Sequence, residues 1–259
     1  MDWKVRFVNY PLHFKSIERE VMATVREVLE CGDLILRRQT EDFEANLAQY
    51  CGTKFAVGTS NCTDALHLAY RAAGIGPGDE VITVSHTFVA TVAAIVHTGA
   101  TPVLIDVGDD HNMDPEKIEP AITAKTKAIV PVSLNGRACD LTRIKQIADS
   151  HGLLVVEDSA QALGATIDGQ IAGSWGLAGC FSFYPAKLLG AFGDAGAVVT
   201  DDEQIAKKVR LLRNHGRTAD NQIACWSFNC RIDNLHAAIL DLKLKRLPEW
   251  IERRRAIAR

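Results

Sequence analysis

The amino-acid sequence predicts an α/β protein that has a mostly parallel sheet with helices on both faces. Two observations point to this fold class. From residue 55 onward, short apolar segments typical of strands alternate with segments of helical periodicity. The apolar run at residues 153–156 also has the length and the β-branched content of a strand buried on both faces. Strands that alternate with helices form parallel sheets that are covered on both sides.

Two helices are expected before the first strand. Apolar residues recur at helical spacing over residues 16–30, and Cys31-Gly32 ends this helix. A second helix is expected over residues 40–50, where Cys51-Gly52 provides the same kind of stop.

The remaining elements follow in alternation. Strands are expected at residues 55–58, 80–84, 102–106, 128–134, 153–157, 181–183 and 197–200. Helices are expected at residues 63–73, 88–98, 118–122, 140–151, 202–214 and 234–247, and Pro248 opens a further one. Asp140 is a typical N-cap for the helix that follows it, and Gly152 is a typical stop.

Composition excludes several classes of function. Of the 259 residues, 47% are hydrophobic and 24% are charged, as in ordinary globular proteins. The formal net charge of −3 gives no electrostatic footprint for nucleic acid or for an anionic membrane, so neither is expected as a partner. The N-terminal residues are too polar for a signal peptide. Seven cysteines without a CxxC pair predict no metal site and free thiols in a reducing, cytoplasmic environment.

Two residues carry the candidate chemistry. Asp158 follows an apolar strand, at the end where open α/β sheets bind ligands, and Lys187 follows an aromatic strand further along. A lysine and an acid on neighbouring strand ends are what pyridoxal phosphate needs. The lysine forms a Schiff base, and the acid keeps the pyridine nitrogen protonated. Taken singly, the lysine is more typical of a solvated surface and the aspartate of a cap or turn.

A phosphate cradle is expected close to these residues. Residues 59–64 follow a strand directly and open a helix, whose free N–H groups and dipole attract anions. The Thr63 hydroxyl can add a donor. An ordinary polar helix cap is the alternative interpretation of this segment.

Three more side chains are candidates to contact the cofactor. Phe88 follows a strand end and could stack on a pyridine ring, although an isolated phenylalanine is more often a core residue. Gln161 lies one helical turn past Asp158, so both can face one ligand. Strand alternation places the Ser182 hydroxyl opposite its two aromatic neighbours.

The sequence resembles the DegT/DnrJ/EryC1/StrS family of pyridoxal-phosphate-dependent nucleotide-sugar aminotransferases. The segments that carry the resemblance are GTSNCTDALHLA, GIGPGDEVITVSHTFVATVAAI, GATPVLIDV, VEDSAQALGA, FSFYPAK, GDAGAVVT and FNCRIDNLHAAIL. They occur in order from about residue 30 to the end of the chain. The resemblance implies the aspartate-aminotransferase fold (fold type I).

The resemblance also implies a role for each candidate residue. Lys187 would bind the cofactor and carry a proton between substrate and cofactor, and Asp158 would pair with the pyridinium nitrogen. The implied cofactor contacts are Gln161 at the ring oxygen, Phe88 on the ring face, Cys62, Thr63 and Ser182 at the phosphate, and Asn229 at the phosphate of the other subunit. Arg231 is a weaker candidate for the same site. The active sites would therefore be shared within a homodimer.

Several positions depart from the family pattern. Cys62 stands where members usually have Gly, Leu188 where Asn is common, Ser133 where many carry His, and Ser227 where Gly usually precedes the phosphate asparagine. Residues 36–39 replace a Gly-containing turn. None of these changes removes a group that the reaction needs.

The resemblance divides the chain into three parts: an N-terminal helical segment (residues 1–30), the cofactor-binding large domain (31–240), and the helical start of a truncated C-terminal small domain (241–259). Family members usually continue well beyond the point that corresponds to residue 259, so we expect the chain to be a fragment.

The resemblance implies transfer of an amino group, with glutamate as donor, to a keto group of a nucleotide-linked deoxysugar. Residues 183–185 and 193–196 look more like those of members that act at C3 than at C4, and C4 remains the alternative. Related sugar dehydratases have His at the lysine position, so Lys187 argues against that activity. A non-catalytic regulatory protein on the same fold stays open. The absence of GxGxxG after the first strand disfavours a dinucleotide-binding protein.

Overall fold

The computed structural model describes residue 4 and residues 6–259 and has a seven-stranded sheet at its centre. The strands lie in the order β1 (Phe55–Thr59), β9 (Gly196–Thr200), β8 (Ala178–Ser182), β5 (Leu154–Asp158), β4 (Thr126–Ile129), β2 (Glu80–Val84) and β3 (Thr101–Ile105). The pairs from β8 to β3 are parallel, whereas β9 runs antiparallel to both of its neighbours. The predicted fold class, a mostly parallel α/β sheet, is confirmed.

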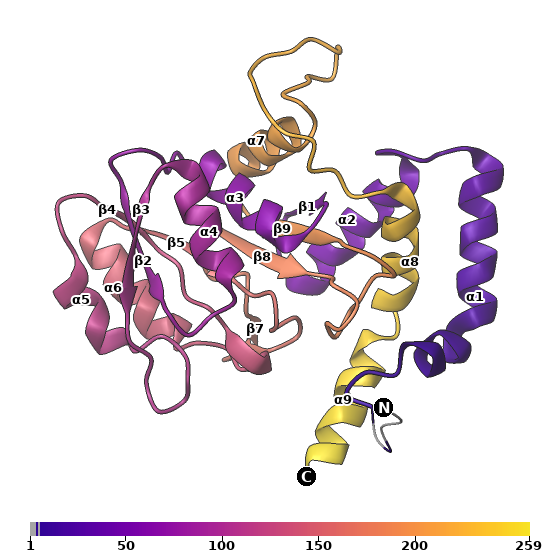
Figure 1. Ribbon diagram of the computed structural model, residues 1–259, viewed down its shortest axis with the longest axis horizontal. Coiled ribbons are helices and arrows are strands. Elements are labelled where there is room, and N and C mark those ends of the chain that lie inside the picture. Colours follow the sequence, from indigo (N-terminus) through magenta and orange to yellow (C-terminus); the bar gives the residue numbers. More distant parts are fainter. Residues whose placement is uncertain (1–3, 5) are drawn as a thin grey trace.

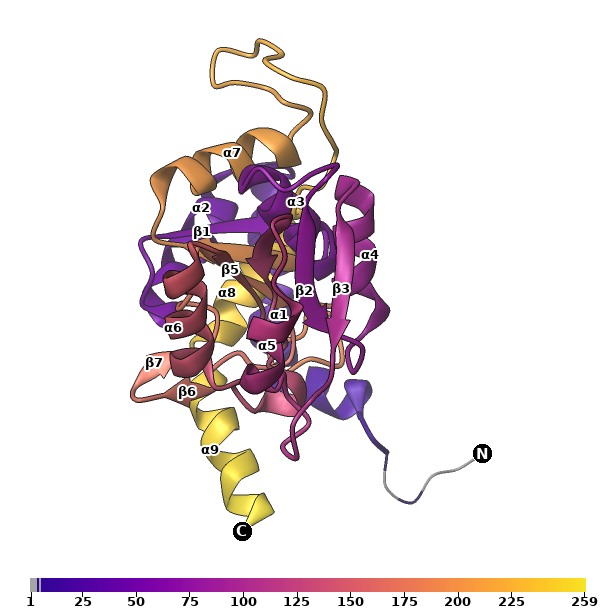
Figure 2. The same cartoon turned by 90° about the vertical axis from the view of Figure 1, so that its left-hand side faces the viewer.

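Helices cover both faces of this sheet (Figure 1). They are α1 (Tyr10–Cys31), α2 (Arg38–Cys51), α3 (Cys62–Ala72), α4 (Val89–Thr98), α5 (Ile118–Ala121), α6 (Leu141–His151), α7 (Glu203–Arg213), α8 (Asn234–Leu244) and α9 (Leu247–Ala258). Figure 2 shows α6 on one side of the sheet and α4 on the other. No helix among the described residues is long and apolar enough to cross a membrane.

Strand alternation divides the core between the two faces. In β5, Val156 packs with residues of α3 and α4, while its neighbour Val155 packs with residues of α6. In β8, Phe181 faces α2 and α8, while Cys180 faces α3. Successive side chains of a strand point to opposite faces, so each strand contributes to both cores.

The predicted helix signals operate as expected. The Asp140 carboxylate accepts a hydrogen bond from the backbone N–H of Arg143, which caps α6. Gly32, Gly52 and Gly152 end their helices in the left-handed conformation that glycine adopts without strain.

Some predicted boundaries were wrong. Helix α1 begins at Tyr10 rather than at residue 16, because Asn9 caps it and proline occupies its first turn. Strand β4 ends at Ile129, since Pro131 has no N–H to donate to the ladder. Strand β8 covers residues 178–182 rather than 181–183.

A short hairpin precedes β8 and was not predicted. Its strands, β6 (Thr166–Ile167) and β7 (Gln170–Ile171), have two residues each, too few for the alternation on which strand prediction depends.

A buried carboxylate fastens the loop after this hairpin to the sheet. Glu157, which is 1% exposed, accepts hydrogen bonds from the backbone N–H groups of Gly173 (2.6 Å), Trp175 (2.7 Å) and Gly176 (2.9 Å). Burial raises the pKa of this carboxyl to about 7, although the three hydrogen bonds act in the opposite direction. Glu157 therefore fixes the end of β5 that carries Asp158.

This arrangement predicts a pH-dependent stability. Between pH 4.5 and 7 the unfolded chain loses the Glu157 proton while the folded protein retains it, so stability falls as the pH rises. The shift from 4.5 to about 7 corresponds to a loss of about 3 kcal/mol. In Glu157→Gln this contribution is absent, and urea unfolding from pH 4.5 to 7 should show a flatter profile than in the wild type. Parallel profiles for the two proteins would contradict this account.

Candidate active site

Asp158 is the centre of the candidate site. It ends the central strand β5 and is 4% exposed. One carboxylate oxygen, Oδ2, accepts a hydrogen bond from the Thr91 hydroxyl at 2.6 Å, and the other, Oδ1, accepts from the backbone N–H of Ala160 at 3.2 Å. Strands β2, β5 and β8 run in the same direction, so Asp158, Ser182 and the segment that leads to Phe88 meet at one edge of the sheet.

The electrostatics of Asp158 combine one unfavourable and three favourable effects. Burial raises the pKa of the carboxyl. The Thr91 hydroxyl, the Ala160 N–H and the positive charge of Lys187 each lower it. Asp158 is thus a buried acid whose ionised form depends on specific neighbours.

Lys187 lies in the loop that connects β8 to β9. The loop turns tightly, because the Lys187 N–H donates to the Tyr184 carbonyl at 2.8 Å and the Ala191 N–H donates to the Phe183 carbonyl at 2.7 Å. The positive charge of Lys187 lowers the pKa of Asp158 and of the Cys62 thiol. Strand β8, which leads into this loop, pairs with β5, so Lys187 and Asp158 follow neighbouring strands. The fold therefore brings together the two candidate catalytic residues and the predicted cradle.

The cradle is the N-terminus of α3. The Asn61 side chain caps the helix by accepting from the Asp64 N–H at 2.8 Å, and the Asp64 carboxylate accepts from the Asn61 amide at 2.8 Å and from the Ser60 hydroxyl. In the described part of the chain, the backbone N–H groups of Cys62 and Thr63 have no acceptor. Burial raises the pKa of the Cys62 thiol well above its ordinary value, so this cysteine is neutral. What the cradle offers is N–H donors.

Strand β9 approaches the cradle so closely that only glycine fits. A Cβ atom on Gly196 would lie 2.5 Å from the Asn61 carbonyl carbon and 2.7 Å from the Cys62 nitrogen. The turn at residues 193–196 therefore ends directly beneath the cradle.

The other predicted contacts occupy the same edge. Phe88 precedes α4 and is 70% exposed, so it is a surface residue rather than part of the core. Gln161 accepts from the Asn135 N–H at 2.9 Å through Oε1, which leaves its amide group to donate. The Ser182 hydroxyl accepts from the Tyr184 N–H at 3.3 Å.

The segment that contains Asn229 lies beside the cradle despite its distance in sequence. The Cys230 carbonyl accepts from the Ser60 N–H at 3.0 Å, and Arg231 forms a β-bridge with Thr59. The Arg231 guanidinium donates to the Asn214 side chain at 3.0 Å. Asn229 itself is exposed. Its contribution to the site of a second subunit stays a prediction.

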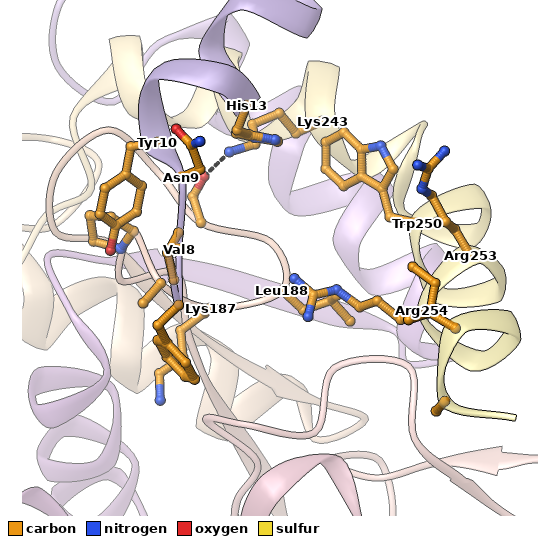
Figure 3. A pocket seen from close by; sticks show the side chains of 16 residues that line it. Val8, Asn9, Tyr10, His13, Lys187, Leu188, Lys243, Trp250, Arg253 and Arg254 are labelled. Carbon is orange, nitrogen blue, oxygen red and sulfur yellow. Dashed lines mark hydrogen bonds between the residues drawn. The ribbon is translucent and has the colours of Figure 1, made fainter. Parts of the chain in front are cut away.

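A cavity of about 600 Å³ lies on the side of the Lys187 loop that faces the helices (Figure 3). Lys187 and Leu188 form one wall, and residues from α1, α8 and α9 form the others, including His13, Lys243, Trp250, Arg253 and Arg254. Asp158, Thr63 and Phe88 do not line it. The cavity is therefore adjacent to the candidate active site but distinct from the cradle.

Sequence reasoning missed one side chain that contacts the central acid. Thr91, which is fully buried, lies 67 positions before Asp158 in the chain and donates a hydrogen bond to it. Its position in the first turn of a helix after a strand end could have indicated that it faces the same sheet edge. Among the described residues there is no cluster of three or more His, Cys, Asp or Glu side chains that could hold a metal ion.

Comparisons with known proteins agree with this geometry. The sequence profile of the DegT/DnrJ/EryC1/StrS aminotransferase family matches residues 15–259. The dTDP-3-amino-3,4,6-trideoxy-alpha-D-glucose transaminase of Streptomyces venezuelae is 43% identical over 256 residues, which cover 98% of this chain and 68% of that protein. A pleiotropic regulatory protein of Geobacillus stearothermophilus is 42% identical over 243 residues, 93% of this chain and 65% of its own.

A solved structure shows the same architecture. The crystal structure of S. venezuelae DesV in complex with a ketimine intermediate superposes with a TM-score of 0.96 at 43% identity, over 98% of this chain and 69% of that one. The chain thus spans about two thirds of the length of these relatives. From the profile match and these identities, the chain belongs to the DegT/DnrJ/EryC1/StrS aminotransferase family.

Proposed function

We propose that the chain is the cofactor-binding part of a pyridoxal-phosphate-dependent aminotransferase. It transfers an amino group, with glutamate as donor, to the C3 keto group of a nucleotide-linked deoxysugar. The observation that carries this proposal is the arrangement at the carboxyl edge of the sheet: Asp158 ends β5, Lys187 follows the adjacent strand β8, and Gly196 packs against the Cys62 end of the cradle. Amine, acid and anion-binding groups are thus within reach of one small ligand.

The donor groups fit pyridoxal phosphate. The cradle offers the N–H groups of Cys62 and Thr63, and the hydroxyls of Thr63 and Ser182 lie on the segments that border it. Gly196 leaves room for the start of α3, because a Cβ atom at this position would clash with the backbone of Asn61 and Cys62. Phe88 presents an exposed aromatic ring, and the Gln161 amide can donate to a ring oxygen. When bound, the cofactor supplies an electron-accepting ring to the carbon that carries nitrogen.

Lys187 and Asp158 would have different roles in the reaction. The Lys187 Nζ atom would hold the cofactor and would carry a proton to or from the reacting carbon. The Asp158 carboxylate would accept a hydrogen bond from the pyridine nitrogen and would favour its protonated form. A buried carboxylate suits this role, because water does not screen its interaction with a ring nitrogen.

The C3 position is favoured over C4. The S. venezuelae relative is named as a transaminase that forms a 3-amino sugar. The turn at residues 193–196 points the same way, because Gly-Asp-Ala-Gly resembles the turn of members that act at C3. The name of the G. stearothermophilus relative leaves a regulatory role as the rival hypothesis. Retention of both Lys187 and Asp158 argues against that role.

We also propose a homodimer in which each subunit lends Asn229 to the other. The exposed loop between α7 and α8 projects from the body of the molecule (Figure 1). It carries Trp226, 97% exposed, and Ile223, 56% exposed, ahead of Asn229. Large apolar side chains at such exposed positions are typical of a surface that meets a partner.

Attachment of the cofactor to Lys187 can be tested chemically. Borohydride converts a carbon–nitrogen double bond into a stable amine, so reduction of the yellow protein followed by peptide mapping should label Lys187. Lys187→Ala should lose the label and all turnover. Lys208→Ala is the matched control, because Lys208 donates to the Ala72 carbonyl away from the site and should leave labelling intact. A label on another lysine in the wild type would refute the assignment.

Sharing of the active sites can be tested by subunit mixing. Lys187→Ala and Asn229→Ala chains should each be nearly inactive alone. If Asn229 acts on the partner, a heterodimer has one site with both defects and one with neither, and activity returns to about half per dimer. Heterodimers that form but stay inactive would place Asn229 in its own subunit's site or outside both.

A further inference from the structure

The central acid is held by a short chain of hydroxyl groups. Thr91 Oγ1 lies 2.6 Å from Asp158 Oδ2, and Thr87 Oγ1 lies 2.7 Å from Thr91 Oγ1. Thr91 is fully buried, so water does not compete for its hydroxyl. The two threonines are four residues apart and lie on either side of Phe88, at the start of α4.

The hydrogen bond that the Thr91 hydroxyl donates to Asp158 Oδ2 fixes the direction of both bonds. An ionised carboxylate has no proton to donate, so Thr91 must donate to it. A hydroxyl has one proton, so Thr91 can only accept from Thr87, which becomes the outer donor. The two bonds then point the same way and polarise each other in favour of the negative charge.

We propose that Thr91, supported by Thr87, is a positioning residue that keeps Asp158 ionised and directed at the ring-nitrogen position. This inference rests on the proposed function. The same residues tie Phe88 to the acid, since the Thr91 N–H donates to the Phe88 carbonyl at 3.1 Å. The acid that would contact the ring nitrogen and the phenylalanine that would stack on the ring are thereby connected through Thr91.

The surroundings of Asp158 leave few other groups to stabilise its charge. The titratable groups that face it are Lys187 from the β8–β9 loop, Cys62 and Tyr70 from α3, and Cys180 from β8. Burial raises the pKa of both thiols and of the phenol well above their ordinary values, so these three are neutral. Apart from the lysine, the stabilising donors are the Thr91 hydroxyl and the longer bond from Ala160.

The test compares variants that keep or remove the hydroxyl. Thr91→Val removes it with little change of shape, and Thr91→Ser retains it. Thr98→Val is the matched control, because Thr98 is a buried threonine of the same helix whose hydroxyl bonds the Ile95 carbonyl instead. The readout is the pH midpoint of the Asp158 carboxyl band, measured by infrared spectroscopy on the cofactor-free full chain and assigned by its loss in Asp158→Asn.

Loss of a donor to a charged group should raise this midpoint by about one to two pH units in Thr91→Val. Thr91→Ser and Thr98→Val should match the wild type. Thr87→Val should give a smaller rise, and it serves as the test variant if Thr91→Val does not fold. A second measurement is the affinity for pyridoxal phosphate as a function of pH. As the pH falls, the affinity of the valine variants should decrease at a correspondingly higher pH than that of the wild type.

A midpoint in Thr91→Val or Thr87→Val that equals that of Thr98→Val would overturn the proposal. The infrared readout needs no cofactor, so it is independent of whether pyridoxal phosphate binds. If the midpoint shifts as expected but borohydride labels no lysine, the proposed function fails while the linkage between Thr91 and Asp158 stands.

Discussion

An ionised carboxylate in a protein interior is unfavourable unless neighbouring groups stabilise its charge. Asp158 is subject to this constraint, because burial raises the pKa of its carboxyl and the surrounding groups of the site lower it. Thr91 reaches it from α4, the Ala160 N–H from its own turn, and the charge of Lys187 from the β8–β9 loop. The groups that stabilise the charge of the acid therefore come from three separate parts of the chain, and the fold must hold all three in register.

The sheet provides this register. Strands β2, β5 and β8 are parallel and deliver their carboxyl ends to one edge, while the antiparallel strand β9 brings the chain back beneath the cradle. Gly196 allows β9 to pack directly against Asn61. Glu157, near the end of β5, accepts a hydrogen bond from the Gly173 N–H and so fastens the loop before β8 to this strand. Rigid backbone on either side of Asp158 leaves its carboxylate few alternative orientations.

The sequence was informative where chemistry is local. Short segments were enough to predict the strand ends that precede Asp158 and Lys187 and the helix start at Cys62. At these places the residues that mark the end of an element are also the residues with the relevant chemistry. The Thr91–Asp158 hydrogen bond could not be predicted in this way, since it joins residues 67 positions apart through tertiary packing alone. The two-residue strands β6 and β7 are too short for a periodic signal. Asn229 owes its prediction to family resemblance rather than to any local pattern.

The central claim is that Asp158 is ionised in its buried position and holds a ring nitrogen protonated. Solid-state or solution NMR of the protein loaded with pyridoxal phosphate labelled with nitrogen-15 in the ring tests it most directly, because the chemical shift separates a protonated from an unprotonated pyridine. The account predicts a protonated nitrogen in the wild type at neutral pH and an unprotonated one in Asp158→Asn. An unprotonated ring nitrogen in the wild type, or the same shift in both proteins, would contradict it.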